Sequence, residues 1–108
     1  MQRSQMTEGR RMPLNSYELM LIVNPALEDE RLNAILDRVK NLVDGDSGVN
    51  ESVDDWGVRR LAYPINKLED GRYLLINFQA KPSLIETISQ QLRLVVDVER
   101  FVVVRKGD

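Results

Sequence analysis

Hydrophobic residues in this chain change their spacing in a fixed order, which constrains the fold more than any other feature. Strand-forming runs bounded by turn residues occupy residues 17–23, 49–63, 73–80 and 98–105. Between the first and second runs, and again between the third and fourth, apolar residues recur at the spacing of a helix. The pattern therefore predicts six elements in the order β-α-β-β-α-β.

Local signals mark the expected helix boundaries. A helix is predicted over about 28–43, since the acidic residues at 28–30 suit the positive first turn. Its apolar positions are Leu32, Ile35, Leu36, Val39, Leu42 and Val43. The second helix is predicted to begin at a capping box formed by Ser83 and Glu86. Its apolar stripe is Ile85, Ile88 and Leu92.

Turn residues and a proline delimit the two middle strands. The turn between them is predicted over 66–71, with Asp70-Gly71 as the hairpin signal. Pro64 has no backbone N–H to donate to a neighbouring strand. The second strand therefore either ends at Pro64 or lies at an edge of the sheet.

This order of elements predicts an α+β fold of the ferredoxin-like type. Right-handed crossovers place both helices on one face of a four-stranded antiparallel sheet. We assign residues 16–106 to this domain and interpret residues 1–15 as a mobile N-terminal arm, because they lack hydrophobic periodicity. The other face of the sheet has no cover within the chain. Met20 and Ile22 point to it, which fits either a partner surface or the scattered apolar residues of an open face.

Composition excludes several kinds of chemistry. The 108 residues suit one domain, and no apolar run reaches the roughly 20 residues of a membrane-spanning helix. The chain contains neither cysteine nor histidine, so thiolate metal sites are excluded and the commonest general base is missing. No phosphate-binding loop, dinucleotide fingerprint or nucleophile elbow occurs. We expect no catalytic residue, no metal and no cofactor.

Charge is distributed unevenly, although the net charge is only −2. Acidic residues dominate 27–56, and basic residues dominate 57–72. An acidic protein can therefore keep a basic face for a phosphate-rich partner.

The stretch GVRRLAYPIN, residues 57–66, holds two consecutive arginines within a predicted strand. Arg59 and Arg60 should point to opposite faces, unless a bulge at Gly57 changes their direction. Guanidinium groups bind phosphate bidentately, and Tyr63 can stack on a base. The alternative is a solvated edge strand, with the arginines paired to Asp54 or Asp55. Trp56 is interpreted as core or as cover for the sheet.

The same stretch resembles the signature of the bacterial-type small-subunit ribosomal protein six family. The matching positions, in order, are Gly57, Arg59, Arg60, Leu61, Ala62, Tyr63, Ile65 and Asn66. The resemblance continues through YELMLIVNP at 17–25, GRYLLINF at 71–78 and the closing strand that ends at Lys106. It thus covers about residues 16–106.

The resemblance implies a ferredoxin-like, non-enzymatic protein that binds the central domain of the small-subunit (16S-type) rRNA. It also implies pairing with small-subunit ribosomal protein eighteen during platform assembly, and a location in cytoplasmic ribosomes, or in the plastid stroma if the source is a plastid. The N-terminal arm is longer than is typical of the family, and the chain ends at Gly107-Asp108 without the tail of some relatives.

On this basis we expect contacts to RNA and to a protein partner. Phosphate or sugar contacts are expected from Arg59, Arg60, Lys67, Arg72, Arg100, Arg105 and Lys106. Tyr63 is expected to stack or to lock the end of the strand. Met20 and Ile22 are expected to contact the protein partner. No membrane and no small-molecule substrate are expected.

Two rival functions use the same topology. A regulatory domain of the ACT class would bind a small molecule at a glycine-rich loop after the first strand, but residues 24–27, NPAL, contain no glycine. An acylphosphatase-like enzyme would need an arginine in a phosphate-binding loop there, where this chain has the acidic residues 28–30.

Overall fold

The computed structural model describes residues 14–65 and 67–107, and it has the predicted element order. The elements are β1 (Asn15–Val23), α1 (Asp29–Gly45), β2 (Val49–Ile65), β3 (Leu68–Ala80), α2 (Pro82–Arg93) and β4 (Val98–Arg105). Residues 1–13, which make up most of the predicted N-terminal arm, lie outside the described residues, as do Asn66 and Asp108. Among the described residues, no helix is long and apolar enough to cross a membrane.

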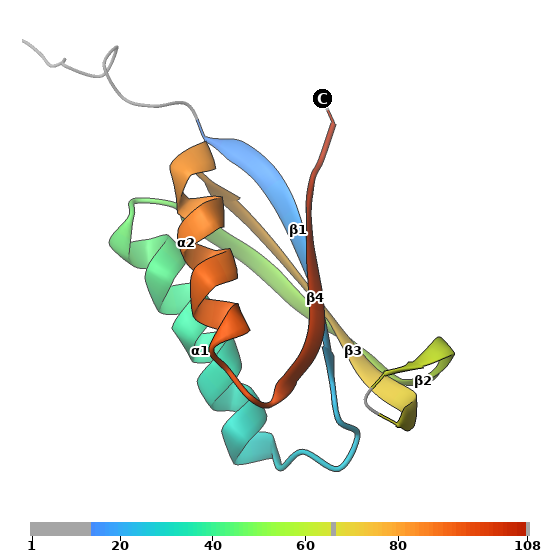
Figure 1. Cartoon of the computed structure of the whole chain (residues 1–108). Coiled ribbons are helices and arrows are strands. Elements are labelled where there is room, and N and C mark those ends of the chain that lie inside the picture. The colour runs from blue at the N-terminus through green and yellow to red at the C-terminus, as the bar shows by residue number, and fades with distance from the viewer. Residues whose placement is uncertain (1–13, 66, 108) are drawn as a thin grey trace, which may run out of the picture.

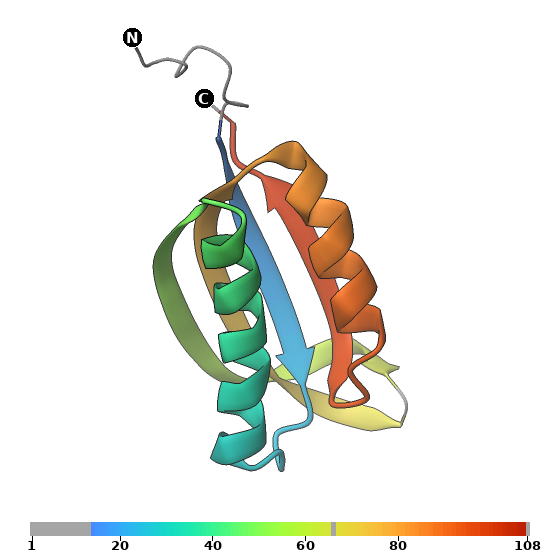
Figure 2. The ribbon, with the colours of Figure 1, turned by 90° about the vertical axis from the view of Figure 1, so that its left-hand side faces the viewer.

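The strands form one antiparallel sheet in the order β2-β3-β1-β4, which confirms the predicted fold class. Both helices lie on the same face of this sheet (Figures 1 and 2). Pro64 lies within β2, which is an edge strand of the sheet. The strand therefore does not end at Pro64, and the proline is accommodated at the sheet edge. We call the face without helices the open face.

The core lies between the helices and the sheet. Alternate residues of β1 and β3 point into it, and the rings of Tyr17 and Phe78 stack there with centroids 5.7 Å apart. The fully buried strand residues include Leu19, Leu21, Val23, Leu74 and Phe78. The helices contribute Leu32, Ile35, Val39 and Val43 from α1, and Leu84, Ile88 and Leu92 from α2. This packing fixes which side of the sheet remains open.

The start of α2 differs from the prediction. Lys81 occupies the N-cap, Pro82 is the first helical residue, and no side-chain oxygen caps the helix. Proline suits the first helical position because its missing N–H would have no partner within the helix and its φ is already helical. The capping box predicted at Ser83 and Glu86 was therefore wrong.

The hairpin of β2 and β3 extends beyond the other strands. β1 pairs with β3 only as far as Arg72, whereas β2 and β3 stay paired up to Ile65 and Leu68. We call residues 58–71 the hairpin arm; its end lies on the side of the sheet away from the helices (Figure 1). The turn lies between Ile65 and Leu68, at the start of the predicted range 66–71. Asp70 and Gly71, which were predicted to be the hairpin signal, instead belong to β3.

The hairpin arm covers one end of the open face. Ile22 is only 8% exposed, and Leu61 of the arm is equally buried. Gly71 makes the close approach possible, since a Cβ there would lie 2.6 Å from Cγ2 of Ile22 and 3.2 Å from Cδ2 of Leu61. Ile22, which was expected to contact a protein partner, is therefore largely covered by the chain's own hairpin arm.

Candidate nucleic-acid interface

The root of the hairpin arm is held by a cluster of charged groups. Nε and Nη2 of Arg72 donate to the two carboxylate oxygens of Asp55, and Nη1 donates to Oδ1 of Asp29 at 3.4 Å. Because Asp55 lies on β2 and Asp29 begins α1, Arg72 joins three elements. We call Asp29, Asp55 and Arg72 the root clamp.

The root clamp also contacts a bulge in β2. Oδ1 of Asp55 accepts the N–H of Gly57 at 2.9 Å, where the pairing with β3 shifts by one residue. Gly57 has φ +79°, a conformation that other residues rarely adopt. The guanidinium of Arg72, followed by the Gly57 N–H, lowers the pKa of the Asp55 carboxyl. A bulge at Gly57, which the sequence analysis named as the exception to simple alternation, is thus present, and the sequence did not indicate its link to Arg72.

The two consecutive arginines have different surroundings. Nε of Arg59 donates to the carbonyl oxygen of Trp56 at 3.2 Å, and its guanidinium carbon lies 5.9 Å from the centre of that ring. Arg60 instead forms an ion pair with Glu69 at 3.5 Å, in which both side chains are largely exposed. Such exposed pairs contribute little to stability, so Arg60 can exchange Glu69 for a phosphate.

The strand register places these arginines on opposite faces. Arg59 lies opposite Gly71, whose missing Cβ would point toward Ile22 on the open face. Residues directly opposite in an antiparallel pair share a face, and consecutive residues alternate. Arg59 therefore leaves the strand on the side of the open face, and Arg60 leaves it on the other side.

Two further predicted residues lie near the end of the hairpin arm. The side chain of Tyr63 is 79% exposed, and Lys67 is exposed within the turn at φ +69°. A single narrow projection therefore carries two arginines, a lysine and an open aromatic ring. These are the side chains that bind phosphates and stack on bases.

The other predicted basic residues lie elsewhere. Arg72 is held in the root clamp, with 24% of its side chain exposed. Arg100 is exposed on β4, opposite Ile22, and so lies on the open face. At the far end of the sheet, Arg105 donates to Oδ1 of Asn15 at 3.3 Å, and the backbone N–H of Lys106 donates to the carbonyl of Ser16. The eight predicted RNA-binding residues thus do not form one cluster.

An apolar strip crosses the open face. Leu75, Met20 and Val102 lie in one row across β3, β1 and β4, and Asp54 of β2 ends the row with a charge. Met20 and Leu75 are half-buried, whereas Val102 and Val104 are about half exposed. Trp56, which was interpreted as core or sheet cover, keeps 44% of its surface exposed beneath Arg59. This partly exposed tryptophan is a candidate contact that the sequence reasoning missed.

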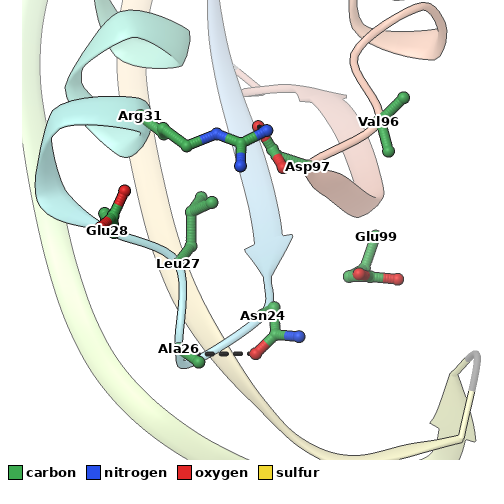
Figure 3. Close-up of a pocket in the computed structure, with 8 residues that line it drawn as sticks. All are labelled: Asn24, Ala26, Leu27, Glu28, Arg31, Val96, Asp97 and Glu99. Atoms are coloured by element: carbon green, nitrogen blue, oxygen red, sulfur yellow. Dashed lines mark hydrogen bonds and ion pairs between the residues drawn. The ribbon is translucent and has the colours of Figure 1, made fainter.

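A pocket between the β1–α1 loop and the α2–β4 loop has a different character (Figure 3). Arg31 and Asp97 form an ion pair across it at 2.8 Å, and Glu28 and Glu99 also line it. Three of its four charged side chains are acidic, which disfavours the binding of an RNA phosphate in this pocket. Within residues 14–65 and 67–107, no group of three or more acidic side chains is placed to hold a metal ion. We therefore assign the hairpin arm, not this pocket, as the candidate interface.

Comparisons with known proteins agree with this architecture. Residues 16–105 match the family model described as ribosomal protein S6. Small ribosomal subunit protein bS6 of Clostridium novyi is 43% identical over 91 residues, which cover 84% of this chain and 96% of that protein. The corresponding protein of Alkaliphilus oremlandii is 38% identical over 92 residues, covering 85% and 97%.

Solved structures show the same fold. The crystal structure of 30S ribosomal protein S6 from Thermotoga maritima superposes with a TM-score of 0.78 at 25% identity, covering 87% of this chain and 89% of that one. The C-terminal domain of MgtC from Mycobacterium tuberculosis superposes with a TM-score of 0.61 at 9% identity, which shows a shared fold alone. From the family match and the bacterial relatives together, the chain belongs to the ribosomal protein S6 family.

Proposed function

We propose that this chain is a constituent of the small ribosomal subunit that binds small-subunit rRNA through its hairpin arm, together with ribosomal protein eighteen. Family membership over residues 16–105 supports the location in the ribosome. The single observation that carries the RNA-binding role is the arm itself, in which β2 and β3 stay paired beyond the last partner of β1. This arm carries the exposed residues Arg59, Arg60, Tyr63 and Lys67.

The arm suits recognition of an RNA backbone. Side chains cannot enter the deep, narrow major groove of A-form RNA, so contacts go mainly to phosphates and sugars. Arg60 and Lys67 are exposed, and a guanidinium can bind two phosphate oxygens at once. The arm therefore supplies position and charge, and it needs no base-specific hydrogen bonds.

The charge distribution orients the protein on RNA. The chain has a net charge of −2, and much of its negative charge lies on α1 and the adjoining part of β2. These acidic surfaces repel phosphate, whereas the hairpin arm attracts it. The protein alone should bind RNA weakly, because few basic groups oppose this repulsion.

The open face is the proposed docking surface for ribosomal protein eighteen. Met20 lies beside Val102 on this face, and Val104 continues the exposed apolar surface. Apolar surface without an internal cover favours association with another protein. Because the arm begins at the edge of this face, a basic partner docked there would lie next to the same RNA.

Not all of the predicted basic residues receive the same role. Arg100 lies on the open face and is placed to contact either the partner or RNA at their boundary. Arg105 and Lys106 lie at the opposite end of β4 and can reach only a separate stretch of RNA. Arg72 has a different role from phosphate binding, because its guanidinium is already paired with two carboxylates.

Binding of a central-domain rRNA fragment to the complex of the two proteins tests this function. Filter binding at several salt concentrations should show tight binding whose affinity falls steeply with salt, because phosphate contacts release counterions. The chain alone should bind more weakly. An affinity for the fragment that equals the affinity for unrelated RNA of the same length would reject the proposal.

A further inference from the structure

The hairpin arm has little support along its own length. β1 ends its pairing at Arg72, so beyond that point β2 and β3 hold only each other. An isolated two-stranded hairpin is marginally stable in water. The direction of the arm must therefore be fixed at its root, where it meets the sheet.

On the helix side of the root, Arg72 contacts carboxylates from two other elements. It faces both oxygens of Asp55 on β2 and one oxygen of Asp29 on α1. Side-on pairing of a guanidinium with a carboxylate restricts both the distance and the relative angle of the groups. Asp55 also accepts the N–H of Gly57 at the bulge where the arm departs.

On the open side of the root, the contact is apolar and close. Ile22 of β1 and Leu61 of the arm both lie against Gly71. The two sides of the root thus hold the arm by different interactions. Only the helix side depends on charge, which allows it to be altered separately.

We propose that Asp55 and Arg72 are positioning residues, which set the direction of the hairpin arm for RNA without touching RNA themselves. The inference rests on the proposed function. Arg72 lies in the most basic part of the sequence, yet its role in this proposal is to hold the arm in place and not to bind phosphate. In the same proposal an acidic residue, Asp55, has a positive role in binding a polyanion.

Loss of the root clamp should lower RNA affinity by reducing the fraction of molecules whose arm points in the direction that binds RNA. RNA binds the arm in one direction, so the apparent affinity is the intrinsic affinity multiplied by the fraction of molecules with that direction. If loss of the root clamp leaves about one fifth of molecules competent, the apparent affinity falls about fivefold. The number of phosphate contacts in the bound state is unchanged, so the salt dependence should keep its slope.

The variant Asp55→Asn separates a positioning effect from an effect of charge, because the two predict opposite changes in RNA affinity. Removing a negative charge near RNA strengthens binding, or leaves it unchanged, if charge alone matters. Weakened positioning instead lowers the affinity despite the favourable change in charge. Asp37→Asn is the matched control, since it makes the same charge change at an exposed position of α1, outside both the root clamp and the open face.

The experiment measures binding of the two-protein complex to the rRNA fragment for the wild type, Asp37→Asn and Asp55→Asn. We expect about fivefold weaker binding for Asp55→Asn, unchanged or tighter binding for Asp37→Asn, and equal salt slopes. If the wild type binds and both variants bind equally well, the positioning role is wrong and the proposed function stands. If the wild type shows no preference for the fragment, the proposed function fails first.

A second measurement applies even if Asp55→Asn lowers overall stability. Amide hydrogen exchange of the free protein, below its melting temperature, should be faster in residues 58–71 of this variant, with the core of β1 and β3 protected as in the wild type. Arg72→Gln should produce the same local change. Unchanged exchange in the arm of both variants would overturn the proposal.

Discussion

Arg59 and Arg60 are consecutive in the sequence, yet Arg59 lies over the ring of Trp56 while Arg60 pairs with Glu69. The first contact holds a guanidinium against an aromatic face beside the open side of the sheet. The second is an exposed pair that water and salt weaken. Arg60 is therefore expected to leave its partner for an RNA phosphate more readily than Arg59.

Replacing both arginines with alanine should weaken RNA binding by the two-protein complex without unfolding the domain. The logarithm of the affinity should also depend less on salt, with a slope smaller by about two if each arginine contacts one phosphate. Arg93→Ala on α2 is the control and should leave both quantities unchanged. A salt titration with the wild-type slope and affinity for the double variant would contradict this assignment.

Tyr63 is predicted to act through its ring, because its side chain is 79% exposed. Tyr63→Ala should weaken RNA binding by roughly 1–3 kcal/mol if a base stacks on it. Tyr63→Phe keeps the ring and should retain most of the affinity. Equal binding by both variants and the wild type in the same filter assay would exclude stacking.

The open face is tested by placing a charge within its apolar strip. Val102→Asp should weaken binding of ribosomal protein eighteen, since a carboxylate would be desolvated in an apolar interface. Val53→Asp is a matched control, because Val53 is 51% exposed, compared with 50% for Val102, but lies opposite Ile76 on the helix side. Calorimetric titration with the partner should therefore separate the two variants, and equal losses would argue against docking on this face.

Gly71→Ala should destabilise the root of the hairpin arm. The added Cβ would lie 2.6 Å from Cγ2 of Ile22, so the arm must shift, at a cost of about 1–3 kcal/mol. Gly45→Ala at the end of α1 meets nothing within 4 Å and should leave the free energy of unfolding equal or slightly higher. Urea unfolding measures both, and an undiminished stability of Gly71→Ala would mean that the Ile22 contact is loose.

The ion pair of Asp55 and Arg72 should make stability depend on pH in a defined direction. Arg72 lowers the folded-state pKa of Asp55, so its contribution is present above the unfolded-state pKa and is lost as the pH falls through the folded value. Wild type should therefore exceed Asp55→Asn in unfolding free energy at pH 7, and the difference should shrink below about pH 4. A difference that stays constant down to pH 2 would contradict the pairing.

The sequence was sufficient for the order of elements and for the core, because both depend on repeated spacing. Leu19 and Leu21 alternate into the core, and the helical residues from Leu32 to Val43 follow a single face. Errors occurred where one local signal stood alone. Ser83 was interpreted as a cap although Pro82, one residue earlier, begins the helix.

The hairpin arm shows why local signals fail at the candidate site. Asp70-Gly71 has the composition of a turn, but Gly71 is needed instead for its close contact with Ile22. The alternation of residues along the first strand correctly placed Ile22 on the open face. This pattern cannot show that the hairpin arm, which is far away in the sequence, packs over that face. The pairing of Asp55 with Arg72 joins residues 17 positions apart, and the sequence offered Arg59 and Arg60 as nearer partners for Asp55.

Sedimentation of the tagged protein in a cell lysate tests the central claim most directly. The family assignment and the exposed hairpin arm predict that it migrates with small ribosomal subunits in a sucrose gradient. They also predict that replacement of Arg59 and Arg60 by alanine moves part of it to the top of the gradient as salt is raised. A wild-type protein that stays at the top of the gradient, free of small subunits at low salt, would contradict the account.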